Sequence, residues 1–221
     1  TTRCASTKQP KKTARKHSKK SPETVVEPPE IDTAGRPWVD QTSSKFSYFE
    51  GYQRAMTAKL QEMIAVDLAG ETAAVRICQA HQFFHPEDSV VQEILEEEKN
   101  HYDIMTEWAG KLSVPPSLLD PLFHFVSIAM GSFTALLGPK AMMCCHAAIE
   151  EVITEHYNDQ LRELVALESS VDSSDHNLKE NLTSLRNTVK QLRDDEQHHH
   201  ELGMDHGGMD FVGANILYHV V

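Results

Sequence analysis

The sequence predicts an all-α protein, a four-helix bundle with an apolar crossover helix and a short C-terminal helix. Three observations predict it. After Tyr48, apolar residues recur every three to four positions, whereas the alternation that is typical of strands is almost absent. Prolines and glycines divide this pattern into segments of helical length. With 221 residues, of which 40% are hydrophobic, the chain can build one domain with a sizeable core.

The expected helices follow in the order that such a bundle needs, with an apolar segment that crosses between the second and third long helices. Asp88 or Ser89 can cap the second expected helix, and Gly203, Gly207 and Gly208 are expected to end the fifth. The expected ranges are 55–84, 89–111, 121–137, 140–168, 178–202 and 211–221.

Residues 1–45 have a different composition and no apolar periodicity. The first 22 residues hold eight of the 21 Lys and Arg residues and none of the 33 Asp and Glu residues. We expect a disordered basic tail that is a remnant of an organelle-targeting leader. A solvated linker or a weak polyanion-binding arm is the alternative. The domain would then span residues 46–221, and its strongly acidic composition argues against a nucleic-acid partner.

Each long helix carries one glutamate at the point where its apolar face would otherwise continue. On the second and the last long helices, a histidine follows this glutamate one turn later. The spacing Glu-x-x-His is common by chance, so the signal is that both copies continue an apolar face. The six residues are Glu71, Glu98, His101, Glu150, Glu196 and His199. Such a set is the ligand arrangement of ferritin-like di-metal carboxylate bundles.

Charge compensation supports a metal site. An ionised carboxylate in a dry core costs several kcal/mol unless it is paired, protonated or bound to a metal. Arg76 and Arg193 lie only near the edges of these helix faces. Two divalent ions would balance four glutamates, and oxygen-rich ligands with two imidazoles suit iron or manganese. We favour two iron ions, because a redox metal accounts for building such a site; acids that are salt-bridged or partly exposed are the alternative.

Three further acids are candidates for orienting the histidines through their second ring nitrogen. Glu97 and Asp195 each precede a Glu-x-x-His motif by one residue, and Asp67 lies one turn before the glutamate of the first helix. Simple solvation of Glu97 and Asp195 is the alternative. In the run of three histidines at 198–200, only the middle one faces the core, so we expect the other two to be solvated.

The order of these motifs resembles the demethoxyubiquinone hydroxylase family of ubiquinone biosynthesis, whose members are ferritin-like di-iron carboxylate proteins. The resemblance covers about residues 49–221. It includes, beyond the six residues, the stretches Asp67–Glu71, Glu98–His101, Glu150–Gln160 and Arg193–Glu196.

The resemblance implies a di-iron monooxygenase that hydroxylates the ring of a demethoxy polyprenyl quinol with dioxygen, using NADH or another reductant. It also implies a peripheral position on the matrix side of the mitochondrial inner membrane and a lipid-binding partner protein of the ubiquinone synthesis complex. Self-association into a homo-oligomer is left open. His156 and Tyr157 lie beside the Glu150 face and are candidates for passing protons or electrons to the site; core packing is the alternative for Tyr157.

The expected helix 121–137 fits a lipid substrate, because apolar side chains cover nearly all of its sides. It is short for a membrane span, which needs about 20 residues. We therefore expect it to lie in the membrane interface or in a protein interface. The alternative is a buried crossover helix within the bundle.

Two other classes of function remain open. The same ligand set would serve a ferritin-class iron-handling or ferroxidase protein, and a metal-free lipid-binding bundle could bury the acids without any ion. A rubrerythrin-like peroxidase is disfavoured, since Cys4, Cys78, Cys144 and Cys145 form no Cys-x-x-Cys pair for a thiolate iron site.

Overall fold

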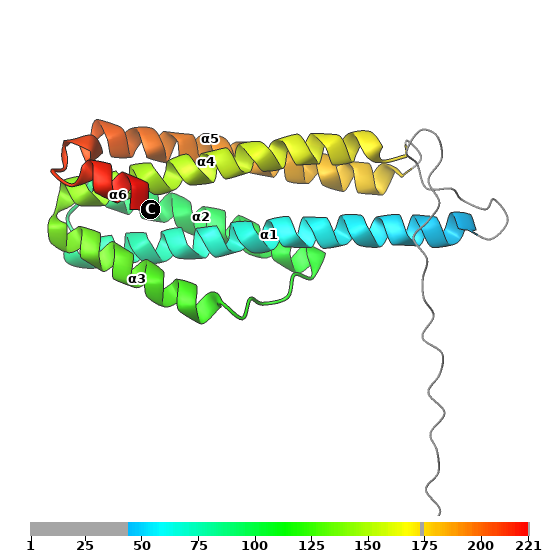
Figure 1. Ribbon diagram of the computed structural model, residues 1–221, viewed down its shortest axis with the longest axis horizontal. Helices are drawn as coiled ribbons and strands as arrows, with labels where there is room; N and C mark the ends of the chain where they lie inside the picture. Colours follow the sequence, from blue (N-terminus) through cyan, green and yellow to red (C-terminus); the bar gives the residue numbers. More distant parts are fainter. Residues whose placement is uncertain (1–43, 173–174, 221) are drawn as a thin grey trace, which may run out of the picture. The chain divides into compact units, whose positions relative to one another are not determined.

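The computed structural model describes residues 44–172 and 175–220, and it confirms an all-helical fold. No strand occurs among these residues. Residues 49–221 form one compact unit. The predicted disordered tail lies outside the described residues except for Ser44 and Lys45, which are helical. The elements are α1 (Ser44–Phe84), α2 (Ser89–Leu112), α3 (Asp120–Leu137), α4 (Pro139–Ser170), α5 (His176–Asp205), the 3-10 turn η1 (Gly208–Asp210) and α6 (Ala214–Val220) (Figure 1).

Helix α1 begins eleven residues earlier than the sequence suggested, at Ser44 rather than Ala55. The apolar period begins only after Tyr48, so the local signal for the first turns of α1 is weak, but contacts of α1 with distant residues support the helix. The Tyr52 hydroxyl lies 2.7 Å from Ser170 Oγ at the end of α4, and Met56 is buried in the core. These tertiary contacts compensate for a weak local helical signal.

The end of α5 is also different from the expectation. Of the three glycines expected to end it, Gly203 lies within the helix, which continues to Asp205, and Gly207 follows in the left-handed conformation. A Cβ at Gly203 would lie 2.8 Å from the carbonyl oxygen of Met143. Gly203 therefore allows α5 to approach α4 closely, and the last helix starts only at Ala214, after η1. At α2, by contrast, the predicted cap is confirmed: Asp88 accepts hydrogen bonds from two backbone N–H groups of the first turn.

Contacts place the four long helices in the order α1, α2, α5, α4 around the bundle, and Figure 1 shows the helices running along its long axis. The short connection 85–88 makes α1 and α2 a hairpin. Trp108 of α2 donates a hydrogen bond to Thr188 of α5 (3.3 Å), α5 packs along α4, and Tyr52 links α1 to the end of α4. Neighbouring helices are thus antiparallel, so α2 and α4 run parallel. The chain must return between them, and α3 makes this crossover.

Helix α3 packs on the outside of the bundle rather than inside it. Its buried residues are the small ones Ser127, Gly131, Thr134 and Ala135, all on one face. Its large apolar side chains are exposed, namely Leu122, Phe123, Phe125, Val126, Ile128, Phe133, Leu136 and Leu137. The alternative of a buried crossover helix is therefore wrong. By length and composition alone α3 could cross a membrane, and only 22% of it is buried.

Apolar layers lie on both sides of a polar layer in the middle of the bundle. On one side, the largest cluster includes Ile64, Leu164 and Leu185, and on the other, smaller clusters include Ile94 and Met143. Burial of such side chains stabilises the fold by roughly 1.5–3 kcal/mol each. The polar layer between them is shielded from water along the bundle axis.

Candidate metal centre

All six residues that the sequence singled out lie together in this polar layer. Each exposes at most 2% of its surface. They form two overlapping groups of four, and within each group the potential ligand atoms lie within 4.8 Å of one another. The first group is Glu71, Glu98, His101 and Glu196, and the second is Glu98, Glu150, Glu196 and His199. Two glutamates belong to both groups, which is the pattern expected for two adjacent cation positions.

The shared glutamates lie between the two histidines. His101 Nδ1 lies 3.0 Å from Glu196 Oε1, and His199 Nδ1 lies 3.0 Å from Glu196 Oε2. His199 Nδ1 also lies 3.1 Å from Glu98 Oε1. The two oxygens of Glu196 thus approach different imidazoles, whose ring centroids are 5.7 Å apart. This is the position of a carboxylate that bridges two sites.

Several polar atoms of the cluster are buried without a hydrogen-bond partner, although such groups are nearly always paired. Among the described residues, every ion pair that a lysine or arginine makes is with an acid outside this cluster. Two divalent cations would satisfy the free atoms and balance four carboxylates, so the residues present fit such a pair. The unpartnered atoms include Glu71 Oε2, Glu98 Oε2 and Glu150 Oε2.

The pKa shifts within the cluster also favour a site for cations. Burial, followed by repulsion from neighbouring glutamates, raises the pKa of Glu71, Glu98 and Glu150. Burial also opposes the charge on Glu196, but hydrogen bonds with the two histidines outweigh it and lower its pKa to about 2. Burial opposes the charge on His199 as well, but hydrogen bonds with Glu196 and Glu98 outweigh it and raise the pKa of His199 to about 12. Without a metal, the cluster therefore holds protons that cations would replace.

Glu97 and Asp195 both contact a histidine of the cluster, and in each case the histidine lies on the neighbouring helix rather than on the acid's own helix. Glu97 of α2 lies 2.6 Å from His199 Nε2 on α5. Asp195 of α5 lies 3.4 Å from His101 Nε2 on α2. Each histidine therefore has a carboxylate at its outer nitrogen, which fixes the ring so that Nδ1 faces the cluster.

Asp67 does not contact either of these histidines, so that part of the prediction is wrong. It is buried, and its Oδ1 lies 3.2 Å from His156 Nε2 and accepts a hydrogen bond from Gln160 Nε2 (2.5 Å). Tyr157, one residue after His156, is 1% exposed and donates a 2.5 Å hydrogen bond to Glu71 Oε1. Sequence reasoning missed Gln160, although it follows His156 by one helical turn.

The two histidines that flank His199 in the sequence, His198 and His200, differ in their exposure to solvent. His198 is exposed, as expected. His200 is only half-buried, and its Nδ1 donates to the carbonyl of Ala147 on α4 (2.8 Å). The expectation that His200 is solvated is therefore wrong, because α5 approaches the α4 backbone closely there.

Two buried histidines near Glu150 were missed by the sequence analysis. His81 Nδ1 lies 3.0 Å from His146 Nε2, and His81 Nε2 lies 2.7 Å from the hydroxyl of Thr134. His146 Nδ1 lies 3.8 Å from Glu150 Oε1. One sequence feature could have identified His146: it precedes Glu150 by four residues and therefore lies on the same helix face.

Comparison with known proteins identifies the family. The family described as "Ubiquinone biosynthesis protein COQ7" matches residues 58–221, which include every residue of the cluster. This chain belongs to the COQ7 family.

The similar curated proteins have related names. A Caenorhabditis elegans protein, "NADPH-dependent 3-demethoxyubiquinone 3-hydroxylase, mitochondrial", is 38% identical over 74% of this chain and 84% of its own. A Saccharomyces cerevisiae protein, "5-demethoxyubiquinone hydroxylase, mitochondrial", is 38% identical over 74% of this chain and 72% of its own. A rat protein with the same name as the C. elegans one is 35% identical over 67% of this chain and 65% of its own.

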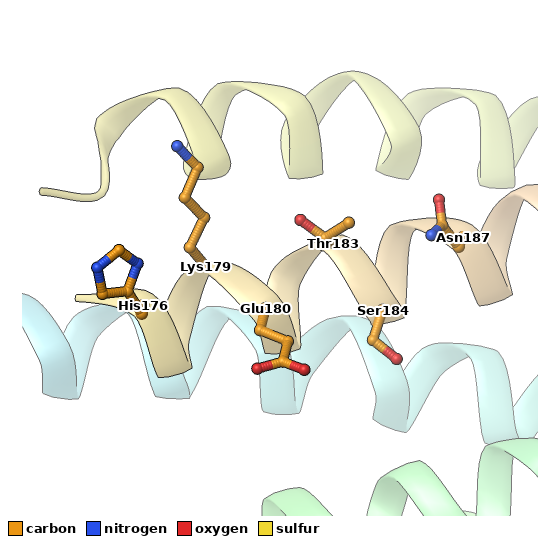
Figure 2. Close-up of a pocket in the computed structure, with 6 residues that line it drawn as sticks. All are labelled: His176, Lys179, Glu180, Thr183, Ser184 and Asn187. Atoms are coloured by element: carbon orange, nitrogen blue, oxygen red, sulfur yellow. The ribbon is translucent and has the colours of Figure 1, made fainter. Parts of the chain in front are cut away.

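Two surface hollows of this COQ7-family chain differ in their relation to the cluster. One of about 530 Å³ lies along the first half of α5 and is lined by polar residues of that helix alone. Figure 2 shows Lys179 pointing away from Glu180 and Ser184, so these side chains do not converge. Another, of about 370 Å³, lies where α1, α2 and the start of α3 meet, and its lining includes Thr72 and Tyr102. These two residues directly follow Glu71 and His101 in the chain.

Proposed function

We propose that this chain is a di-iron monooxygenase of ubiquinone biosynthesis that hydroxylates the ring of a demethoxy polyprenyl quinol with dioxygen. The observation that carries the proposal is the buried pair of donor groups that share Glu98 and Glu196. Membership of the COQ7 family and the names of the similar hydroxylases support the substrate and the pathway.

Six side chains would hold the metals. Glu71 and His101 would help to hold one ion and Glu150 and His199 the other, and Glu98 and Glu196 belong to both groups. When bound, two iron ions supply the activation of dioxygen and the oxidation of the ring. Iron is proposed rather than manganese because the family that the sequence resembles consists of di-iron carboxylate proteins.

The protein's own side chains orient the donors and exclude water. Glu97 and Asp195 hold the two histidines through their outer nitrogens, and Tyr157 holds one oxygen of Glu71. Apolar layers above and below keep water from reaching the centre along the bundle axis. These contacts keep the donors in place before the metals bind.

His156 is well placed to exchange protons with solvent. Its side chain is 41% exposed, while its partner Asp67 is fully buried. The hydrogen bond with Asp67 raises the pKa of His156. We assign to His156 and Asp67 the entry of protons from the surface, and to Tyr157 the position next to Glu71 where a proton or electron would be delivered.

The substrate would approach from α3. The hollow beside Thr72 and Tyr102 lies at the start of α3, whose exposed apolar residues would contact lipid. At 18 residues α3 is about 27 Å long, slightly less than the hydrocarbon core of a bilayer. We therefore propose that α3 lies in the interface on the matrix side of the mitochondrial inner membrane and that a lipid-binding partner protein delivers the quinol there.

The electron donor is proposed to be NADPH, because similar hydroxylases are named for their dependence on it. Two electrons and two protons are needed to convert the second oxygen atom of dioxygen to water when the first enters the ring. The sequence suggested only NADH or another reductant.

The decisive experiment combines iron-loaded protein, demethoxy-quinol, NADPH and isotopically labelled dioxygen, followed by mass analysis of the quinol. We expect one labelled oxygen atom in the ring and none with the Glu196→Ala variant. Continued uptake of iron well beyond two ions per chain, without labelled product, would instead indicate an iron-handling protein. Fewer than one metal ion per chain after loading would indicate a metal-free bundle and overturn the proposal.

A further inference from the structure

A chain of three polar side chains joins helix α3 to the cluster, and the roles described so far do not use it. Thr134 of α3, His81 of α1 and His146 of α4 are each at most 2% exposed. The Thr134 hydroxyl lies 2.7 Å from His81 Nε2, and His81 Nδ1 lies 3.0 Å from His146 Nε2. At the far end, His146 Nδ1 lies 3.8 Å from Glu150 Oε1.

The chain has a direction, because a neutral imidazole has one N–H and one lone pair. A hydrogen bond between His81 Nδ1 and His146 Nε2 needs an N–H on one nitrogen and a lone pair on the other, so the two rings cannot both be protonated, and the dry core favours the neutral form of each. The Thr134 hydroxyl can donate either to a carbonyl of its own helix, that of Met130 (2.9 Å) or Gly131 (3.1 Å), or to His81 Nε2. When it donates to His81, each ring donates onward, and an N–H is left at His146 Nδ1, beside Glu150.

The opposite direction leaves a lone pair at His146 Nδ1, facing the same carboxylate. A carboxylate must be ionised to bind a metal, and an ionised Glu150 is stabilised by an N–H and repelled by a lone pair. The direction that starts at Thr134 is therefore the one that matches a metal-binding Glu150.

We propose that Thr134, His81 and His146 are positioning residues that orient the carboxylate of Glu150 for metal binding and connect it to α3. The inference rests on the proposed function, since it assigns Glu150 to the metal site. Gly131 of α3 fits so closely against α1 that a Cβ there would lie 2.7 Å from the carbonyl oxygen of Ile77. The position of Thr134 is thereby fixed relative to α1. A displacement of α3 changes the first hydrogen bond of the chain and, through both rings, the orientation of Glu150.

The test is a titration of the full, chelator-stripped chain with Co²⁺, read by affinity and by the visible absorption spectrum. Thr134→Val removes the hydroxyl with little change in shape, and His146→Leu removes the donor beside Glu150. We expect His146→Leu to weaken Co²⁺ binding about tenfold or more and Thr134→Val to alter the spectrum with a smaller loss of affinity. His146→Asn retains an N–H near the position of Nδ1 and should restore most of the affinity.

Ser127→Ala is the matched control for Thr134→Val. Ser127 is also a buried hydroxyl of α3, but it donates to the carbonyl of Phe123, in its own helix (2.7 Å). The control should leave affinity and spectrum unchanged. Circular dichroism shows whether each variant is folded. If His146→Leu does not fold, the result for Thr134→Val decides the test.

The results separate this inference from the proposed function. If the unsubstituted chain binds two Co²⁺ ions and the Thr134 and His146 variants bind them with the same affinity and spectrum, the three residues are core packing and the inference is wrong. It is also wrong if Ser127→Ala has the effect of Thr134→Val. If the unsubstituted chain binds no Co²⁺, the proposed function fails first.

Discussion

At the scale of single residues, Glu71, Glu98 and Glu150 are carboxyl groups whose burial disfavours their charged form, so we expect them to weaken the metal-free fold. Glu150 is the clearest case. It is 1% exposed, its Oε2 has no hydrogen-bond partner, and burial raises its pKa well above the ordinary value. Replacing such a carboxyl by an apolar group should help the metal-free fold and harm metal binding.

We therefore expect Glu150→Leu to stabilise the metal-free chain by about 1–3 kcal/mol while it removes one metal site. The measurements are urea unfolding in the presence of chelator and metal content after loading. Leu164→Ala, which empties part of the core, is the control that should destabilise the chain by about 2–5 kcal/mol. If Glu150→Leu were as destabilising as this control, the carboxyl would be satisfied within the protein and would need no cation.

The residues of the cluster could be found in the sequence because each ends an apolar face, and the face of a helix follows from its period. Their outer partners could not be assigned in the same way. Glu97 was expected to support a histidine, but the structure pairs it with His199 of α5, across the bundle. Which carboxylate reaches which ring depends on how two helices are staggered, and a single helix period does not contain this information. His81 and His146 were missed because each, taken alone, is a lone histidine on an apolar face.

At the scale of elements, α3 depends on its small residues to dock against α1. Gly131 is the tightest point, since a Cβ there would lie 2.7 Å from the carbonyl oxygen of Ile77 and 2.9 Å from Ala80 Cβ. We expect Gly131→Ala to destabilise the chain by about 1–3 kcal/mol, because α3 must shift outward. Thermal or urea unfolding measures this directly.

Gly110→Ala on α2 is the matched control. No atom lies within 4 Å of a Cβ at that position, so the variant should gain about 0.5–1 kcal/mol from helix propensity. Equal effects of the two substitutions would mean that α3 does not pack against α1 at Gly131.

The exposed side of α3 leads to a separate prediction about membranes. Phe123 and Phe125 are 45% and 70% exposed on a helix without Lys or Arg. Changing both to Ser should weaken binding to liposomes about tenfold or more, since two aromatic rings no longer enter the lipid. Metal content should stay the same. The control is Val152→Ser on α4, which removes another exposed apolar side chain and should change neither liposome binding nor metal content. If the double variant bound liposomes as well as the unsubstituted chain, the apolar side of α3 would be assigned to a protein interface.

The sequence showed the apolar composition of α3 but not whether this helix lies inside the bundle or on its outer surface. Apolar residues on nearly every face are equally typical of a buried crossover helix and of a lipid-facing one. The distinction lies in the row formed by Ser127, Gly131 and Thr134, whose small side chains let the backbone approach α1 and turn the large residues outward. The early start of α1 was missed for a related reason: Tyr52 is held by Ser170, 118 residues away.

At the scale of the whole molecule, metal binding and folding should be one coupled equilibrium. The six donors come from four helices that are distant in the sequence, so only the folded chain brings them together. A ligand that binds only the folded state stabilises it by about 2.7 kcal/mol at a free concentration of one hundred times its dissociation constant. Anaerobic Fe²⁺ should therefore raise the melting temperature of the chelator-stripped chain by roughly 5–10 °C, and chelator should reverse the shift.

The variant that tests this coupling is His101→Ala. Its imidazole is 1% exposed and lies 3.0 Å from Glu196 Oε1, so its loss removes a donor from one group but leaves the apolar layers intact. We expect helical content close to that of the unsubstituted chain and a much smaller Fe²⁺-induced shift. The double variant at Phe123 and Phe125 should keep the full shift, because those side chains face away from the bundle. A shift of equal size in His101→Ala would place the stabilising ion elsewhere on this acidic chain and remove the physical link between the cluster and the fold.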